Sequence, residues 1–255
     1  MDTKMLADRV AIVTGGGQGV GQGIARALAA RGATVAVVGR TASKLDATKA
    51  LIEEEGGRCG TFVGDVKDVD AIAAIVEAVA QRWGRIDILV NNAQQVPLGA
   101  LLEVTDDRFQ TGFSSGPLAT FRFMKACHPH LKASGDAMII NLTSSTTKRW
   151  DMAGYGAYAA VKSAIVSLTR AAAAEWGVDG IRALTVAPHA ESAGLAWWME
   201  ANPDEAAAFF QTIPLRRIGE CRDDIGVAVA ALCGPEFRYL TGATIPLDGG
   251  QANFT

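Results

Sequence analysis

Seven short apolar runs recur along this chain, and each of the first six is followed by a longer stretch with helical spacing. Strands that are apolar throughout need helices on both faces of a parallel sheet, because neither face can meet water. The order therefore predicts one doubly wound α/β domain over residues 1–255, with about seven strands. The expected strands are 10–13, 34–38, 59–63, 86–90, 138–142, 181–186 and 243–247. The expected helices are 20–31, 43–55, 68–83, 106–131, 155–176 and 223–232.

The first expected strand runs directly into a glycine-rich turn, Thr14-Gly-Gly-Gly-Gln-Gly-Val-Gly21, and then into the first helix. Glycines let the backbone approach a ligand closely, and a helix N-terminus presents unpaired N–H groups to a pyrophosphate. The turn therefore predicts a dinucleotide site. Its expected contacts are Gly15, Gly17, Gln18, Gly19, Val20 and Gly21.

Tyr158 and Lys162 stand four residues apart in a helical stretch, so their side chains share one face of that helix. A lysine charge beside a tyrosine favours the phenolate. We therefore expect a proton-transfer pair in which Lys162 lowers the pKa of Tyr158.

Five motifs in this order resemble those of the short-chain dehydrogenase/reductase family, of its classical type. Besides the glycine turn and Tyr-x-x-x-Lys, they are Asp65-Val66, Asn91-Asn92-Ala93, and Pro188 with the closing Leu247-Asp-Gly-Gly250. The resemblance spans essentially the whole chain. It implies a Rossmann-type fold, a homotetramer or homodimer, and hydride transfer between NAD(H) or NADP(H) and an alcohol or carbonyl. It also implies that Asp65, Val66, Asn92, Ala93, Tyr158, Lys162 and Pro188 contact the cofactor.

By the same resemblance, Tyr158 is the general acid in reduction and the general base in oxidation, while Lys162 also holds the nicotinamide ribose. A serine that polarises the carbonyl is expected within Asn141-Leu-Thr-Ser-Ser145. Alignment of the strand end favours Ser144, whereas the usual interval to the tyrosine favours Ser145. We choose Ser144 as catalytic and assign Ser145 to the substrate site.

A second tyrosine leaves another reaction open. Tyr155 and Lys162 have the Tyr-x6-Lys spacing of enoyl-acyl reductases, which reduce a C=C bond. We prefer Tyr155 as a residue that lines the substrate pocket, because the glycine turn matches the classical type. A C=C reductase remains the alternative.

The end of the second expected strand bears on the choice of cofactor. Gly39 stands where NAD-preferring relatives usually carry Asp, and Arg40 can pair with a 2′-phosphate. We therefore favour NADP(H) and assign Arg40 and Thr41 to its site. NAD(H) stays possible, because Gln18 replaces a basic residue that many NADP-dependent relatives place in the turn.

Three positions depart from the family pattern. Gln94 and His189 each replace a glycine, near the expected nicotinamide, and both are assigned to the substrate site. Gly116 stands where the family has an active-site Asn that stabilises a helix kink. We expect Gly116-Pro117 to kink the helix by another route. These departures motivate a rival hypothesis, a catalytically weakened dinucleotide-binding protein.

Residues 189–215 form the longest irregular connection and are rich in apolar side chains, among them Trp197 and Trp198. We expect this segment to cap the substrate and assign both tryptophans to its site. The predicted substrate is a fairly hydrophobic ketone or secondary alcohol.

Composition excludes several kinds of partner. The net charge is -3 and the basic residues are scattered, so we expect neither nucleic acid nor a membrane surface as a partner. No run reaches the roughly 18–20 apolar residues of a membrane span. His128 and His130 have no further ligand at metal spacing, and the four cysteines stand far apart, so no metal site is predicted. We expect a cytoplasmic protein.

Overall fold

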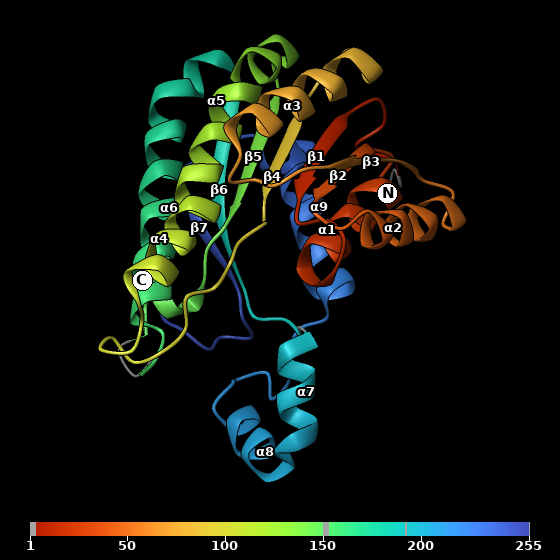
Figure 1. The fold of residues 1–255 in the computed structure, drawn as a ribbon. Coiled ribbons are helices and arrows are strands. Elements are labelled where there is room, and N and C mark those ends of the chain that lie inside the picture. The colour runs from red at the N-terminus through yellow and green to blue at the C-terminus, as the bar shows by residue number, and fades with distance from the viewer. Residues whose placement is uncertain (1–3, 150–152, 192, 255) are drawn as a thin grey trace.

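The computed structural model describes residues 4–149, 153–191 and 193–254, and it shows one parallel sheet with helices on both faces (Figure 1). The strands are ordered β3-β2-β1-β4-β5-β6-β7, so the direction of winding changes between β1 and β4. The predicted doubly wound α/β architecture is confirmed. The strands are β1 (Val10–Thr14), β2 (Thr34–Gly39), β3 (Arg58–Val63), β4 (Ile88–Asn91), β5 (Ala137–Leu142), β6 (Ile181–Pro188) and β7 (Thr244–Leu247).

Two apolar cores, one on each face, hold the helices to the sheet. Neighbouring strand residues point to opposite faces, so Val13 packs in one core and Ile12 in the other. The first core is covered by α1 (Gly19–Ala30), α2 (Ala42–Glu54) and α9 (Val227–Leu232), and the second by α3 (Val69–Trp83), α5 (Pro117–Ser134) and α6 (Gly156–Trp176). Within the described residues, no helix is both long and apolar enough to span a membrane.

The helix expected over residues 106–131 is two helices, α4 (Asp106–Ser115) and α5, which meet at Gly116. Gly116 has φ −98° and ψ −101°, outside the helical region, and Pro117 takes the first position of α5. A proline fits that first turn because its missing N–H would be unpaired there anyway. Helical hydrogen bonds still cross this point, from the Gly116 N–H to the Gly112 carbonyl at 3.0 Å and from the Thr120 N–H to the Gly116 carbonyl at 2.8 Å, so the two helices meet at a kink.

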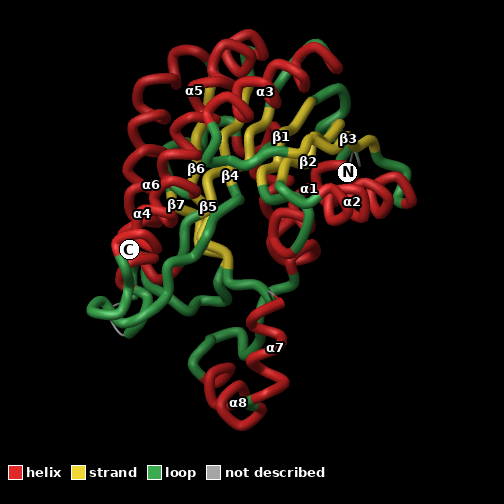
Figure 2. Tube along the Cα trace, viewed as in Figure 1, coloured by secondary structure: helices red, strands yellow, loops and turns green. Residues whose placement is uncertain are grey.

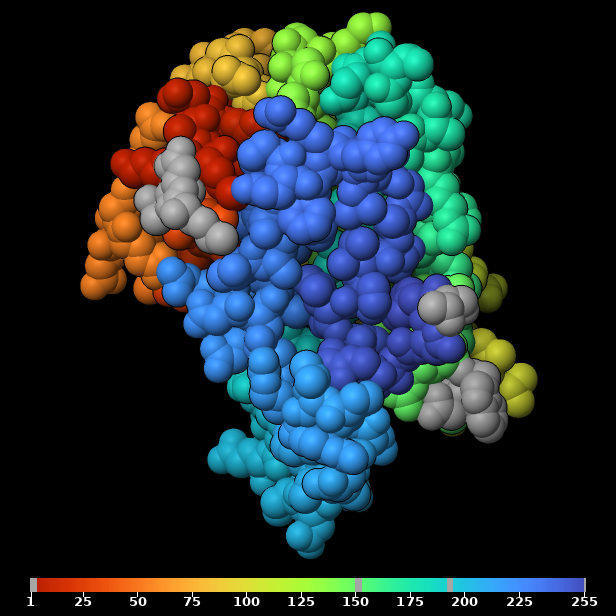
Figure 3. All heavy atoms as spheres, turned by 180° about the vertical axis from the view of Figure 1, so that it is seen from behind, coloured from red at the N-terminus to blue at the C-terminus, as the bar shows by residue number. Residues whose placement is uncertain are grey.

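Residues 189–215 are more regular than the sequence suggested. They contain α7 (Ala193–Ala201) and α8 (Pro203–Gln211), which extend beyond the rest of the molecule at the carboxyl ends of the strands (Figures 2 and 3). Phe209 joins this pair to the body, because its ring meets Trp198 at 6.0 Å and His189 at 5.6 Å, edge to face. Trp197, in contrast, is 69% exposed.

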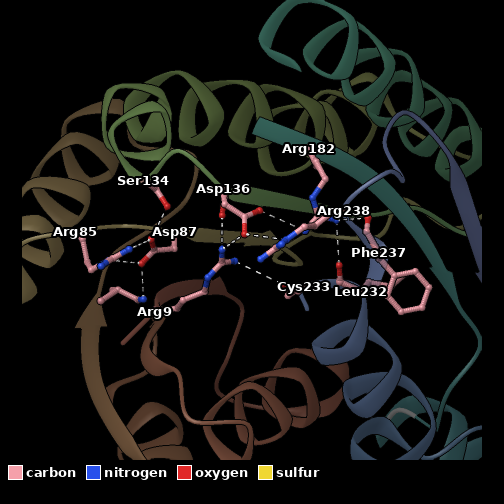
Figure 4. Close-up of polar contacts among 11 residues, drawn as sticks. Arg9, Arg85, Asp87, Ser134, Asp136, Arg182, Leu232, Cys233, Phe237 and Arg238 are labelled. Atoms are coloured by element: carbon pink, nitrogen blue, oxygen red, sulfur yellow. Dashed lines mark hydrogen bonds and ion pairs between the residues drawn. The ribbon is translucent and has the colours of Figure 1, made fainter. Parts of the chain in front are cut away.

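Buried and half-buried charges close the opposite, amino-terminal edge of the sheet (Figure 4). Arg9 precedes β1 and donates to both the Asp136 carboxylate, at 2.7 Å, and its carbonyl, at 2.6 Å. Arg182 at the start of β6 donates to the Phe237 carbonyl at 2.9 Å. These contacts join the strand ends to neighbouring loops and stabilise this edge of the sheet. We therefore expect ligand sites at the opposite, carboxyl edge.

A close glycine contact holds α1 to a π-helical turn, Cys221–Gly226. A β-carbon on Gly23 would lie 2.1 Å from the Cys221 carbonyl oxygen. Because the backbone atoms on both sides would have to separate, we expect Gly23→Ala to lower the free energy of unfolding by about 3 kcal/mol. Urea unfolding measures this change. Gly177→Ala is the matched control, since nothing lies within 4 Å of its β-carbon, and equal losses in both variants would contradict the close contact.

Candidate active site

A cleft of about 410 Å³ opens at the carboxyl ends of β1, β2, β3 and β4, where the winding changes direction. Such a switch point is the usual ligand site of an open α/β sheet. Most of the predicted cofactor contacts line it, namely Gly15, Gly17, Gln18, Gly19, Val20, Gly21, Arg40, Thr41, Asp65, Val66, Asn92 and Ala93. Six further residues that were not predicted from the sequence also line the cleft, namely Gly39, Lys44, Leu45, Gly64, Gln95 and Ser115.

Thr14 fixes the glycine turn to the end of β4. Its hydroxyl oxygen accepts hydrogen bonds from the backbone N–H groups of Asn92, at 3.0 Å, and Ala93, at 3.1 Å. A β-carbon on Gly21 would lie 2.3 Å from the Gly15 carbonyl oxygen, so only glycine fits there. The turn thereby keeps the start of α1 open to the cleft.

The N-terminus of α1 fits the phosphates of a dinucleotide. Gln18 occupies the N-cap position without a capping hydrogen bond from its side chain, and the first turn of α1 carries no acidic residue. Its first N–H groups are therefore free of side-chain competition and carry the partial positive charge of the helix end. Gly19 has nothing within 4 Å of its β-carbon position, which leaves room beside this end.

A basic corner, formed by Arg40 and Lys44, lies at the β2 end of the cleft. Lys44 Nζ donates to the Gln18 side-chain oxygen at 2.5 Å. The N-cap of α2, Thr41, also makes no side-chain capping bond, and the first turn of α2 holds no acidic residue. The corner can therefore hold an anion. Lys44 could have been predicted from the sequence, because it is a basic residue in the first turn of the helix that follows β2.

Ser144, Tyr158 and Lys162, the three predicted catalytic side chains, come together beside the end of β5. Lys162 is 4% exposed, and its Nζ donates to the Leu142 carbonyl at 2.7 Å. Nζ also lies 5.6 Å from the centre of the Tyr158 ring. The hydroxyls of Tyr158 and Ser144 share a hydrogen bond.

The two neighbouring serines face different partners. Ser144 starts a 3-10 turn, Ser145–Thr147, and makes the contact with Tyr158. Ser145 instead donates at 2.6 Å to the carboxylate of the buried Asp248. Ser145 therefore joins the turn after β5 to the end of β7, and only Ser144 shares a hydrogen bond with the phenol.

The expected lowering of the Tyr158 pKa by Lys162 is wrong. Burial raises the pKa of Tyr158 to about 12, although the hydrogen bond with Ser144 opposes this. Burial also lowers the pKa of Lys162 to about 7, so the ammonium itself is disfavoured, and Nζ is directed at the Leu142 carbonyl. At neutral pH Tyr158 is a protonated phenol, that is, a proton donor.

Comparison with known proteins agrees with this geometry. A family model described as enoyl-(acyl carrier protein) reductase matches residues 15–252. A 12alpha-hydroxysteroid dehydrogenase of Clostridium sp. (strain ATCC 29733 / VPI C48-50) is 37% identical over 251 residues, which cover 95% of this chain and 96% of the relative. The chain belongs to the short-chain dehydrogenase/reductase family. It is an NAD(P)-dependent oxidoreductase, as the motifs predicted.

Solved structures of the short-chain dehydrogenase/reductase family match the whole fold. A dehydrogenase/reductase from Sinorhizobium meliloti 1021 has a TM-score of 0.90 at 32% identity, and the match covers 98% of both chains. A variant of actinorhodin polyketide ketoreductase with NADPH has a TM-score of 0.90 at 28% identity and covers 98% of this chain and 99% of its own.

The residues predicted to bind substrate in this short-chain dehydrogenase/reductase are spread over several elements. Gln94 lines the cleft, Tyr155 is 37% exposed just before α6, and Trp197 points to solvent. His189, after Pro188 at the end of β6, is half-buried, and its Nδ1 has no hydrogen-bond partner among the described residues. Burial lowers the pKa of His189, which the Asp248 carboxylate opposes, so the neutral imidazole is favoured.

Proposed function

We propose that this chain transfers hydride between NADP(H) and a fairly hydrophobic ketone or secondary alcohol, with Tyr158 as acid and base. The observation that carries the proposal is the hydrogen-bonded pair of Ser144 and Tyr158, with the buried Lys162 one helical turn further on. With its pKa raised to about 12, the phenol of Tyr158 is protonated at neutral pH, so the proton needed in the reduction is present.

Three side chains have separate roles in the proposed reduction of the substrate. The Ser144 hydroxyl donates to the carbonyl oxygen and orients it, and the Tyr158 hydroxyl gives that oxygen a proton as the alcohol forms. In its protonated form, Lys162 places a positive charge one helical turn from the phenolate that this proton transfer leaves on Tyr158. The nicotinamide supplies the hydride when bound.

The glycine turn and the start of α1 would hold the pyrophosphate, and Asp65 and Val66 the adenine end. The relative with NADPH and the basic corner both favour the phosphorylated cofactor. The steroid dehydrogenase at 37% identity favours a large apolar ring system as substrate. The apolar α7–α8 pair, which we propose caps the substrate, agrees with that choice.

Removing the basic corner should change cofactor preference. Arg40→Ala with Lys44→Ala is expected to raise the Kd of NADPH about 10–100-fold and to leave the Kd of NADH within about twofold. The reason is that charge-assisted hydrogen bonds to a phosphate contribute about 1.5–3 kcal/mol. Fluorescence titration measures both constants. Lys49→Ala, which removes a lysine paired at 3.8 Å with Glu53 outside the cleft, should change neither. An equal loss for both cofactors would argue against a 2′-phosphate site.

The proposed function is tested by a turnover screen. Ketones of increasing size, including a 12-oxosteroid, are offered with NADPH and with NADH, and secondary alcohols with the oxidised cofactors. Turnover that depends on Tyr158 supports the proposal. Cofactor binding without any such turnover favours the rival hypothesis of a catalytically weakened dinucleotide-binding protein.

A C=C reductase is the second candidate, since the matching family model is described as an enoyl-(acyl carrier protein) reductase. In that case Tyr155 would be the acid. Substituting each tyrosine in turn distinguishes the two reactions. Tyr158 shares a hydrogen bond with Ser144, whereas Tyr155 is half-exposed.

A further inference from the structure

Gln94 carries a buried carboxamide without a partner. It follows β4 at the inner end of the cleft, and both its Nε2 and its Oε1 are shielded from solvent. Neither atom makes a hydrogen bond within the described part of the chain. Burying an amide unpaired costs free energy, so such a group is expected where a bound molecule supplies the missing partner.

The carboxamide lies in space that the kink between α4 and α5 leaves open. A β-carbon on Gly116 would stand 2.9 Å from Gln94 Nε2, which is too close for any side chain without displacing the amide. The backbone of Gly116 does not itself demand glycine, because its φ of −98° is open to other residues. The neighbouring atoms, among them the Gly112 carbonyl oxygen at 2.9 Å from the β-carbon position, oppose a side chain here.

This contact lies directly against the helix that carries the proton donor. The same β-carbon position on Gly116 is 3.0 Å from a methyl carbon of Val161, and Val161 immediately precedes Lys162 on α6. Ser115 fixes the loop beside it, because its hydroxyl accepts from the Gln95 N–H at 3.0 Å and donates to the Thr111 carbonyl at 2.7 Å. The Gln94 carboxamide therefore lies between the end of β4 and α6, the helix that carries Tyr158 and Lys162.

We propose that Gln94 and Gly116 form one unit, in which the missing side chain at 116 admits the Gln94 carboxamide to the bound cofactor and carbonyl substrate. The inference rests on the proposed function, because the bound cofactor and the carbonyl substrate would supply the hydrogen-bond partners that the amide lacks. It also implies that a carboxamide carried by residue 116 can replace one carried by residue 94, because the two side chains would occupy the same space.

A mutant cycle tests the unit. Gln94→Ala is expected to lower kcat/KM about tenfold or more, and Gly116→Ala to lower it similarly by displacing the carboxamide. In Gln94→Ala the further change Gly116→Ala should cost less than it does in the wild type, because the carboxamide is gone and only the contacts with the Gly112 carbonyl and Val161 remain. The exchange Gln94→Gly with Gly116→Asn should recover most of the lost kcat/KM. Additive losses in the cycle, or an exchange variant no better than Gln94→Ala, would overturn the proposal.

Stability provides a readout that needs no turnover. Gln94→Met keeps the shape and removes the unpaired polar atoms, so it should raise Tm by about 2–4 °C while lowering kcat/KM. A carboxamide with a purely structural role would instead lower Tm on removal. If the wild-type chain reduces no ketone, the proposed function fails in the turnover screen. If the wild type is active and Gln94→Met keeps full activity, only the Gln94–Gly116 unit fails.

Discussion

Tyr158→Phe is expected to lower the turnover number for reduction of a ketone by about a thousandfold or more. The Kd of NADPH should change less than about twofold. Loss of a positioned general acid typically costs 10²–10⁴-fold, and Tyr158 is the tyrosine that shares a hydrogen bond with Ser144. Removal of one hydroxyl leaves the ring packed on α6, so the fold is retained. Steady-state turnover and fluorescence titration of NADPH measure the two effects.

Tyr155→Phe is the matched control, because it removes the same hydroxyl three residues earlier at the start of the same helix. Its turnover should stay within about threefold of the wild type. The opposite ranking, with Tyr155→Phe inactive and Tyr158→Phe active, would favour the C=C reductase and remove Tyr158 from the catalytic role.

Lys162→Met is expected to abolish turnover and yet to stabilise the chain at pH 7, on the order of 3 kcal/mol. Burial lowers the pKa of Lys162 from 10.5 to about 7. The unfolded chain therefore binds this proton more tightly than the folded chain between these two values, so wild-type stability rises with pH across that window. Below about pH 7 the folded lysine is charged and the full cost of burial is present.

Urea unfolding from pH 6 to pH 10 measures this dependence. The stability advantage of Lys162→Met over the wild type should shrink as pH rises, since the two chains differ only in this titration and in the single hydrogen bond to Leu142. Lys49→Met replaces a half-exposed lysine and should show no such trend. A constant difference between Lys162→Met and the wild type across the range would show that Lys162 is not buried as a neutral amine.

The sheet and its helices were predictable because their signals are local. Apolar runs and helical spacing give the strands β1 to β7 and the helices packed on them. The two segments predicted imperfectly depend on long-range contacts. At the kink, Gly116 lies close to Gln94 and Val161, which are distant in sequence, and the α7–α8 pair is joined to the body through His189 and Phe209.

The sequence by itself determined the family, the glycine turn, and the spacing that brings Tyr158 and Lys162 to one helix face, since each depends on neighbours along the chain. Only the tertiary structure decided which serine meets the phenol and added Lys44 to the basic corner. The packing also reversed the expected sign of the Tyr158 pKa shift, because burial, which the sequence does not specify, outweighs the lowering by the hydrogen bond with Ser144. It further brought Gln94 and Gly116, 22 residues apart, into one contact. Hydrogen-bond partners and burial depend on which strands become neighbours, and that is a property of the whole fold.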